Sequence, residues 1–248
     1  MANAHEPQPD ELPMSEMPSP TDLSKAAMLR LKGDRSVRDG DTRKAVRHYQ
    51  RSLRLNPRDH VAWNNQGVAL ARTGEVREAI QSYTQALKLK PRYEKAWYNK
   101  GKAFQQLGMY QGALVCYASV LKINPRASAA WINMGVAYRE MGSYDRALSC
   151  YDKALEMSPA SAVAWNNLGV LLSRTGNLKR ALHCLNKSLE CDPNLEEALQ
   201  ERERVIERMA SPSDLVLPPE PEGPAGPPQA QTTGTNPTGP SPDDSKSM

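Results

Sequence analysis

Several features of membrane-spanning or secreted chains are missing from this sequence. It contains no run of about 18 apolar residues, so we expect no transmembrane helix. Its first 20 residues (MANAHEPQPDELPMSEMPSP) have neither a basic region nor an apolar core, so they do not form a secretory signal. We therefore expect a cytoplasmic protein that does not act at a membrane.

Motifs of catalysis and of cofactor binding are also missing. The four histidines show no metal-ligand spacing, and there is no Gly-x-x-x-x-Gly-Lys loop, nucleophile elbow or catalytic carboxylate pair. We therefore expect a protein that is not an enzyme and that holds neither a cofactor nor a metal.

The chain has only four cysteines, and their spacing argues against a disulfide. Cys116, Cys150 and Cys184 are each 34 residues apart. Equivalent sites on neighbouring packed helices lie about 8–10 Å apart, which exceeds the limit of about 7 Å for the Cα atoms of a disulfide. Cys191 lies two helical turns beyond Cys184. We expect small, half-buried thiols in a reducing compartment.

Proline and charge divide the chain into three parts. Residues 1–24 contain five of the 20 prolines, and residues 211–248 contain ten. Both segments are acidic, whereas residues 25–210 carry 31 basic and 18 acidic residues. Such a positive middle part can attract an acidic partner or nucleic acid, of which we expect the acidic partner. The alternative is that the acidic terminal segments simply balance this charge. We expect both terminal segments to be disordered because they lack hydrophobic periodicity.

The middle part repeats every 34 residues. Several columns keep this step, and they are Trp63, Trp97, Trp131 and Trp165; Gly33, Gly67, Gly101, Gly135 and Gly169; Ala45, Ala79, Ala113, Ala147 and Ala181; and Pro57, Pro91, Pro125, Pro159 and Pro193. The pattern of each unit predicts two helices. In residues 60–93 the first helix ends at Gly74, a residue that readily takes the left-handed conformation, and the second ends before Pro91.

The pattern resembles the tetratricopeptide repeat family, which has Trp, Gly, Tyr, Ala and Pro at fixed places in 34 residues. The resemblance implies an all-α fold, a right-handed α-solenoid of five helix–turn–helix repeats. The expected units are 26–59, 60–93, 94–127, 128–161 and 162–195 within an array spanning 25–210. Residues 196–210 form an amphipathic pattern that predicts a capping helix, which a solenoid needs to cover its last apolar side.

The resemblance implies a groove lined by the first helix of each unit, and one polar column lies there. The sixth residue of four units is asparagine, at Asn65, Asn99, Asn133 and Asn167. Asparagine is a poor residue for a helix interior, but its amide can pair bidentately with a peptide group. The column is similar to the asparagine ladder of O-linked N-acetylglucosamine transferase superhelices and kinesin light chains. The alternative is a structural role, with hydrogen bonds inside the array.

Further groove candidates would make the groove basic. They are Arg30, Arg72, Lys95, Tyr98, Lys102, Arg139 and Arg174. A basic groove suits an acidic segment or a C-terminal carboxylate. Arg30, Asn65 and Lys95 also fit part of a carboxylate clamp found in some relatives. However, Asp34 stands where that clamp needs asparagine, and Asn99 stands where it needs a basic residue.

These observations favour a non-catalytic scaffold or adaptor that binds an extended peptide or protein segment. The first unit favours a second hypothesis, because residues 25–59 carry 11 basic and four acidic residues. That unit could belong to a nucleic-acid-associated assembly protein, or its charge could only keep an end helix soluble. A third hypothesis is an accessory subunit of an enzyme on another chain. The partner and the oligomeric state stay open.

Overall fold

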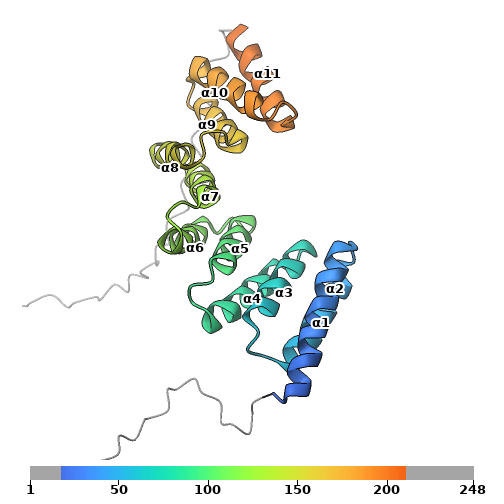
Figure 1. Cartoon of the computed structure of the whole chain (residues 1–248). Helices are drawn as coiled ribbons and strands as arrows, with labels where there is room; N and C mark the ends of the chain where they lie inside the picture. The colour runs from blue at the N-terminus through green and yellow to red at the C-terminus, as the bar shows by residue number, and fades with distance from the viewer. Residues whose placement is uncertain (1–17, 211–248) are drawn as a thin grey trace, which may run out of the picture.

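A computed structural model of the chain describes residues 18–210, and every regular element in that range is an α-helix (Figure 1). The helices are α1 (Pro20–Arg38), α2 (Thr42–Leu55), α3 (His60–Arg72), α4 (Val76–Leu89), α5 (Glu94–Gln106), α6 (Tyr110–Ile123), α7 (Ser128–Glu140), α8 (Tyr144–Met157), α9 (Ala162–Arg174), α10 (Leu178–Cys191) and α11 (Glu196–Ala210). The all-α repeat solenoid is thereby confirmed. Residues 1–17 of the N-terminal tail predicted over 1–24, and the whole C-terminal tail predicted over 211–248, lie outside the described residues.

The helices form a stack of pairs with an inner and an outer layer. Each helix packs on the next one along the chain, and the odd-numbered helices also contact each other from α1 through α11. Within residues 18–210 the even-numbered helices α2 to α10 do not contact one another. Because the odd-numbered helices approach more closely, they line the concave side of the array, with α1 and α11 at its opposite ends (Figure 1).

The first helix begins earlier than the sequence analysis predicted. We assigned residues up to 24 to the N-terminal tail, but α1 starts at Pro20 and runs for 19 residues. Ser19 caps it by accepting a hydrogen bond from the backbone N–H of Asp22, and proline suits the first helical position. These two residues are the sequence signal for the earlier start.

Each turn inside a helix pair depends on a glycine. Gly40, Gly74, Gly108, Gly142 and Gly176 have φ angles of 83°, 90°, 70°, 73° and 81°. Other residues adopt this left-handed region only with strain. The five glycines therefore explain why every first helix reverses into its partner at the same place in the unit.

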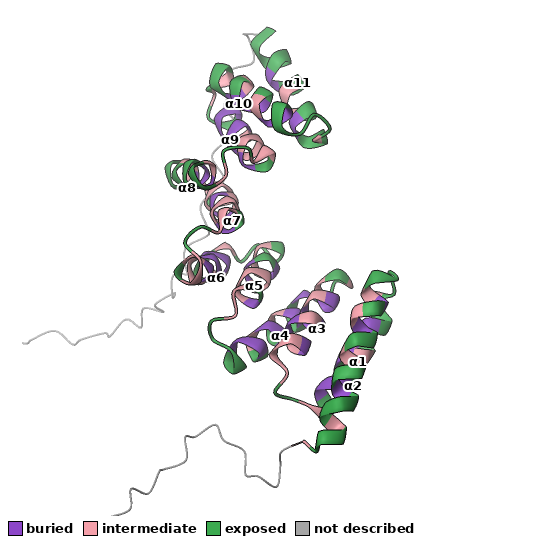
Figure 2. Cartoon of the chain, in the orientation of Figure 1, coloured by how far each residue is buried: buried purple, intermediate pink, exposed green. Residues whose placement is uncertain are grey.

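A second glycine column lets the two helices of a pair come close. A Cβ atom on Gly67 would lie 2.6 Å from Cε1 of Tyr83, and one on Gly135 would lie 2.4 Å from Cε1 of Tyr151. The tyrosine rings thus pack directly on the backbone of the first helix, and they are almost fully buried. Figure 2 shows that the buried residues face between the helices and that exposed residues cover the outside.

Candidate peptide-binding groove

The asparagine column lies on the concave side, and most of its amide groups join neighbouring units. Nδ2 of Asn65 donates to Oδ1 of Asp34 at 2.9 Å, and Nδ2 of Asn99 donates to Oδ1 of Asn64 at 3.0 Å. Nδ2 of Asn133 donates to the hydroxyl of Tyr98 at 2.9 Å. These bonds cross from α3 to α1, from α5 to α3 and from α7 to α5. These three asparagines therefore have a structural role, because each ties its unit to the unit before it.

Asn167 breaks this pattern, and its neighbour explains why. The residue equivalent to Asn64 and Tyr98 in the preceding unit is Ile132, which has no acceptor. Nδ2 of Asn167 instead donates to the carbonyl of Val163 in its own helix at 2.9 Å. Its Oδ1 accepts a hydrogen bond from Nη1 of Arg139 at 3.2 Å.

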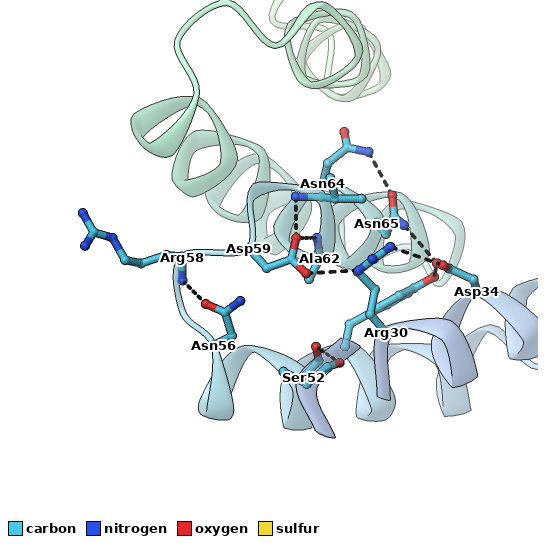
Figure 3. Close-up of polar contacts among 12 residues, drawn as sticks. Arg30, Asp34, Ser52, Asn56, Arg58, Asp59, Ala62, Asn64 and Asn65 are labelled. Carbon is cyan, nitrogen blue, oxygen red and sulfur yellow. Dashed lines mark hydrogen bonds and ion pairs between the residues drawn. The ribbon is translucent and has the colours of Figure 1, made fainter. Parts of the chain in front are cut away.

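The N-terminal part of the column belongs to a polar network around Asp34 (Figure 3). Oδ1 of Asp34 accepts hydrogen bonds from the hydroxyl of Tyr49 at 2.8 Å and from Asn65. Asn64 donates to Asn65 at 3.2 Å, which extends the network to Asn99. Burial, and next the hydrogen bond to Asp34, raise the pKa of Tyr49, so this tyrosine stays a donor over the ordinary pH range.

Arg30 is also engaged in this network, which bears on the carboxylate clamp. Nε of Arg30 lies 3.0 Å from Oδ2 of Asp59, and Nη1 lies 3.8 Å from Oδ2 of Asp34 (Figure 3). Asp59 in turn caps α3 by accepting from the backbone N–H groups of Val61 and Ala62. Arg30 and Asn65 therefore already bind carboxylates of the chain itself. In a carboxylate clamp the same two side chains would have to bind the carboxylate of a ligand.

The middle of the concave side is hollowed on both sides of Asn99. One hollow of about 560 Å³ is lined by residues of α3, α4, α5 and α7, among them Arg72, Lys102, Asn99 and Asn133. The other, of about 380 Å³, is lined by residues of α5, α6 and α7 and the turn before α7, among them Lys95, Tyr98 and Asn99. We call these two hollows together the central groove. Six of the sequence-predicted site residues meet there: Arg72, Lys95, Tyr98, Asn99, Lys102 and Asn133.

The predicted basic residues fall into two classes. Arg72, Lys95 and Lys102 are exposed and make no ion pair with any carboxylate in the part of the chain that the structure describes. In contrast, Nε of Arg139 lies 3.0 Å and Nη1 of Arg174 lies 3.9 Å from Oε1 of Glu140. The positive charge of the groove is therefore concentrated on α3 and α5, and it is partly neutralised on α7 and α9.

Sequence reasoning missed the acceptors that hold the asparagine column. Asn64 and Tyr98 are the fifth residues of their units, and each accepts a hydrogen bond from the asparagine 35 residues later. The spacing of 35 residues between each acceptor and its asparagine, which is one unit plus one residue, is the sequence signal that could have predicted these pairs. Asp34 was noticed only as a departure from the clamp, although it receives two hydrogen bonds.

The basic surface of the first unit lies on the outer helix α2, away from the central groove. Arg43, Lys44, Arg47, Arg51 and Arg54 are all exposed, and α2 contains no acidic residue. None of these five makes an ion pair within residues 18–210. Burial, and next the charges of Lys44 and Arg51, lower the pKa of the half-buried His48.

Three of the four cysteines lie where unreactive thiols are expected. Cys116, Cys150 and Cys184 are buried, Cys191 is exposed, and all four are free thiols. Burial raises the thiol pKa of Cys116 and of Cys150 to about 11. Across residues 18–210, no group of three or more His, Cys, Asp or Glu residues could hold a metal ion, and no helix is long and apolar enough to cross a membrane.

Comparison with protein families identifies the repeat. Three tetratricopeptide repeat models match residues 30–94, 94–126 and 126–194, which together span about two thirds of the chain. No curated protein sequence matches it.

Solved structures share the fold. A tetratricopeptide repeat protein from Parabacteroides merdae matches with a TM-score of 0.67 and 25% identity, over 75% of this chain and 74% of that one. MamA from Desulfovibrio magneticus RS-1 matches with a TM-score of 0.64 and 25% identity, over 69% and 97% of the two chains. YrrB, a tetratricopeptide repeat protein with an unusual peptide-binding site, matches with a TM-score of 0.59 and 22% identity, over 72% and 92%.

Proposed function

We propose that this chain, which belongs to the tetratricopeptide repeat family, is a non-catalytic scaffold that holds an extended acidic segment of another protein in the central groove. Membership of the family supports a protein-interaction scaffold. The acidic, extended nature of the bound segment is inferred from the groove itself.

One observation carries this proposal. Arg72 and Lys102 line the larger hollow beside Asn99, and Lys95 lines the smaller one together with Glu94. No carboxylate of residues 18–210 forms an ion pair with these three cations. A guanidinium and two ammonium groups without partners attract a carboxylate-rich segment and select its charge. An exposed pair contributes at most about 1 kcal/mol, so binding needs several such pairs together with contacts to the groove floor.

The asparagines would contribute differently from the bidentate pairing that the sequence suggested. Nδ2 of Asn133 donates two hydrogen bonds within the protein, to Tyr98 and to the carbonyl of Ala129. Nδ2 of Asn99 donates one, to Asn64. Oδ1 of each accepts none from the described residues, so these oxygens would accept hydrogen bonds from peptide N–H groups. Each would add a net of about 0.5–1.5 kcal/mol.

The floor of the groove also suits an extended chain. Val68, Ala71 and Ala103 line the larger hollow, and Ala127, Ala129 and Ala130 line the smaller one. These small apolar side chains leave room for backbone and short side chains between the charged positions. A segment that alternates acidic and small apolar residues matches this arrangement, because alternate side chains of an extended strand point to opposite faces.

The test compares groove and outer-face variants of equal charge. Lys95→Gln with Lys102→Gln removes two groove cations, whereas Lys88→Gln with Lys122→Gln removes two exposed cations from the outer helices α4 and α6. A labelled peptide of alternating Glu and Ala is titrated with each protein and followed by fluorescence anisotropy. We expect at least a tenfold loss of affinity for the groove variant and less than a twofold loss for the control. Equal losses would overturn the proposal.

A second candidate function, contact with nucleic-acid phosphates, is favoured by α2. Its five exposed cations and the absence of acids on that helix form an uncompensated positive row. Phosphate contacts release counterions, so binding of a duplex DNA probe would fall steeply with salt. Arg47→Gln with Arg51→Gln should reduce that slope by about 2 in log–log units if both arginines contact phosphates. An unchanged slope would reject this candidate and leave the groove proposal intact.

A further inference from the structure

The N-terminal end of the array exposes side chains at places that are buried in every later unit. Met28 of α1 is 56% exposed, and its counterparts Ala62, Ala96, Ala130 and Ala164 are fully buried. Arg35 of α1 is exposed too, and its counterparts Ala69, Ala103, Ala137 and Leu171 are at most 2% exposed. In the later units these places pack against the preceding unit. The outer face of α1 is therefore a stacking face with nothing from residues 18–210 on it.

The C-terminal end has a matching feature on α11. One side of this helix is buried against the array through Ala198 and Val205, and Arg208 fixes it by donating to the carbonyl of Ser173 at 2.9 Å. The other side exposes Leu199, Ile206 and Met209, which are 38%, 49% and 39% exposed. Leu199 and Ile206 occupy places that pack on the second helix in the five complete units, and α11 has no such partner within residues 18–210.

An ordinary second helix does not suit this side of α11. Glu203 stands at the place of Gly33, Gly67, Gly101, Gly135 and Gly169. Those glycines leave no room for a Cβ atom beside the ring or side chain of the partner helix. A glutamate there excludes such close packing, and its charge favours a partner that is positively charged.

The two end faces complement each other in charge and in apolar character. The α1 face combines Met28 and Leu31, which is 60% exposed, with Lys25, Lys32 and Arg35. The α11 face combines its three apolar side chains with Glu196, Glu203 and Glu207. The lysines of the first face and the glutamates of the second make no ion pair within residues 18–210. Exposed apolar side chains rimmed by charge are typical of an interaction surface.

We propose that α11 of one copy of the chain docks on α1 of a second copy, so that the protein associates head to tail. The two faces lie at opposite ends of one array and cannot meet within a copy (Figure 1). The contact is heterologous, since it joins two different surfaces. Each docked copy still has one free end face. Further copies therefore add to a ring if the rotation between successive copies closes on itself, and to a filament if it does not.

The proposal is tested with full-length variants blocked at one end. The head variant carries Met28→Asp and Leu31→Asp, and the tail variant carries Leu199→Asp and Ile206→Asp. Molar mass is measured by sedimentation equilibrium over a hundredfold range of concentration, with circular dichroism to check folding. The wild type should grow in mass with concentration, and each variant alone should stay monomeric. An equimolar mixture should form 1:1 dimers and nothing larger, because only one intact pair of faces remains.

Two controls sharpen this test. Val115→Asp on α6, at a side chain that is 63% exposed but far from both ends, should associate like the wild type. Lys32→Glu and Glu203→Lys should each weaken association, and both together in one chain should restore it. A wild type that stays monomeric at every concentration, or head variants that still dimerise among themselves, would overturn the proposal. A truncated chain that ends at Ala210 is measured in the same way. If it associates although the full chain does not, residues 211–248 cover an end face in place of a second copy.

Discussion

Asn99 donates a hydrogen bond from Nδ2 to Oδ1 of Asn64 at 3.0 Å and thereby ties α5 to α3. The two residues are 35 positions apart, which is one repeat unit plus one residue. The same step joins Asn133 to Tyr98. The asparagine that looks like a ligand contact in the sequence is thus held by the fifth residue of the unit before it.

The first prediction concerns this bond. Asn64 is buried and does not line the central groove, so Asn64→Ala should reduce stability without removing a groove contact. We expect the free energy of unfolding to fall by about 1–3 kcal/mol, because Asn99 loses its partner and the network around Asn65 is interrupted. Urea denaturation followed by circular dichroism measures it. An unchanged midpoint would show that the bond contributes nothing.

The second prediction compares two buried tyrosines. The hydroxyl of Tyr49 donates to Asp34, whereas the hydroxyl of Tyr151 is buried and has no hydrogen-bond partner among residues 18–210. Tyr49→Phe should therefore lower the free energy of unfolding by about 1–3 kcal/mol. Tyr151→Phe should leave it unchanged or raise it, since burying an unpaired hydroxyl is unfavourable. Denaturation midpoints of the two variants, measured side by side, check this order, and the reverse order would contradict it.

The third prediction concerns alkaline pH. Burial raises the pKa of Tyr151 to about 12, and it also raises the pKa values of Tyr49, Tyr83 and Tyr117. The unfolded value is about 10, so the folded state favours the neutral phenols. Their contribution is complete below pH about 10 and is lost as the pH rises towards the folded pKa values.

Between pH 8 and pH 11 each of these tyrosines should account for a loss of about 1 kcal/mol of stability. Urea midpoints at the two pH values measure the fall. Tyr83→Phe should show a smaller fall than the wild type. A midpoint that does not change with pH would mean that these phenols titrate normally in the folded chain.

The fourth prediction concerns thiol reactivity. Only Cys191 is exposed, and burial raises the pKa values of Cys116, Cys150 and Cys184. A maleimide at neutral pH should therefore label the native protein once per chain, and Cys191→Ser should abolish rapid labelling. Mass spectrometry counts the labels, and urea should release the other three sites. Rapid labelling of more than one thiol in the native state would contradict the burial of this column.

Periodic residues made the fold readable from the sequence, whereas the site depended on pairings that the period does not show. The Trp, Gly, Ala and Pro columns each occupy the same structural position in every unit, in a helix interface or a turn. Their spacing therefore predicts the helix pairs. The earlier start of α1 was missed because Ser19 and Pro20 lie outside the 34-residue lattice. The engagement of Arg30 and Asn65 depends on Asp34 and Asp59, which belong to no column, so only the three-dimensional arrangement reveals it.

The groove assignment is tested most directly by mapping where a peptide contacts the chain. A ¹⁵N-labelled protein is titrated with the alternating Glu–Ala peptide, and backbone and asparagine side-chain amide shifts are followed by NMR. We expect the largest changes on α3, α5 and α7, including the side-chain amides of Asn99 and Asn133, with little change on α2, α8 and α10, which do not line the groove. Changes confined to α8 and α10, or to α2 with its exposed cations, would contradict binding in the central groove.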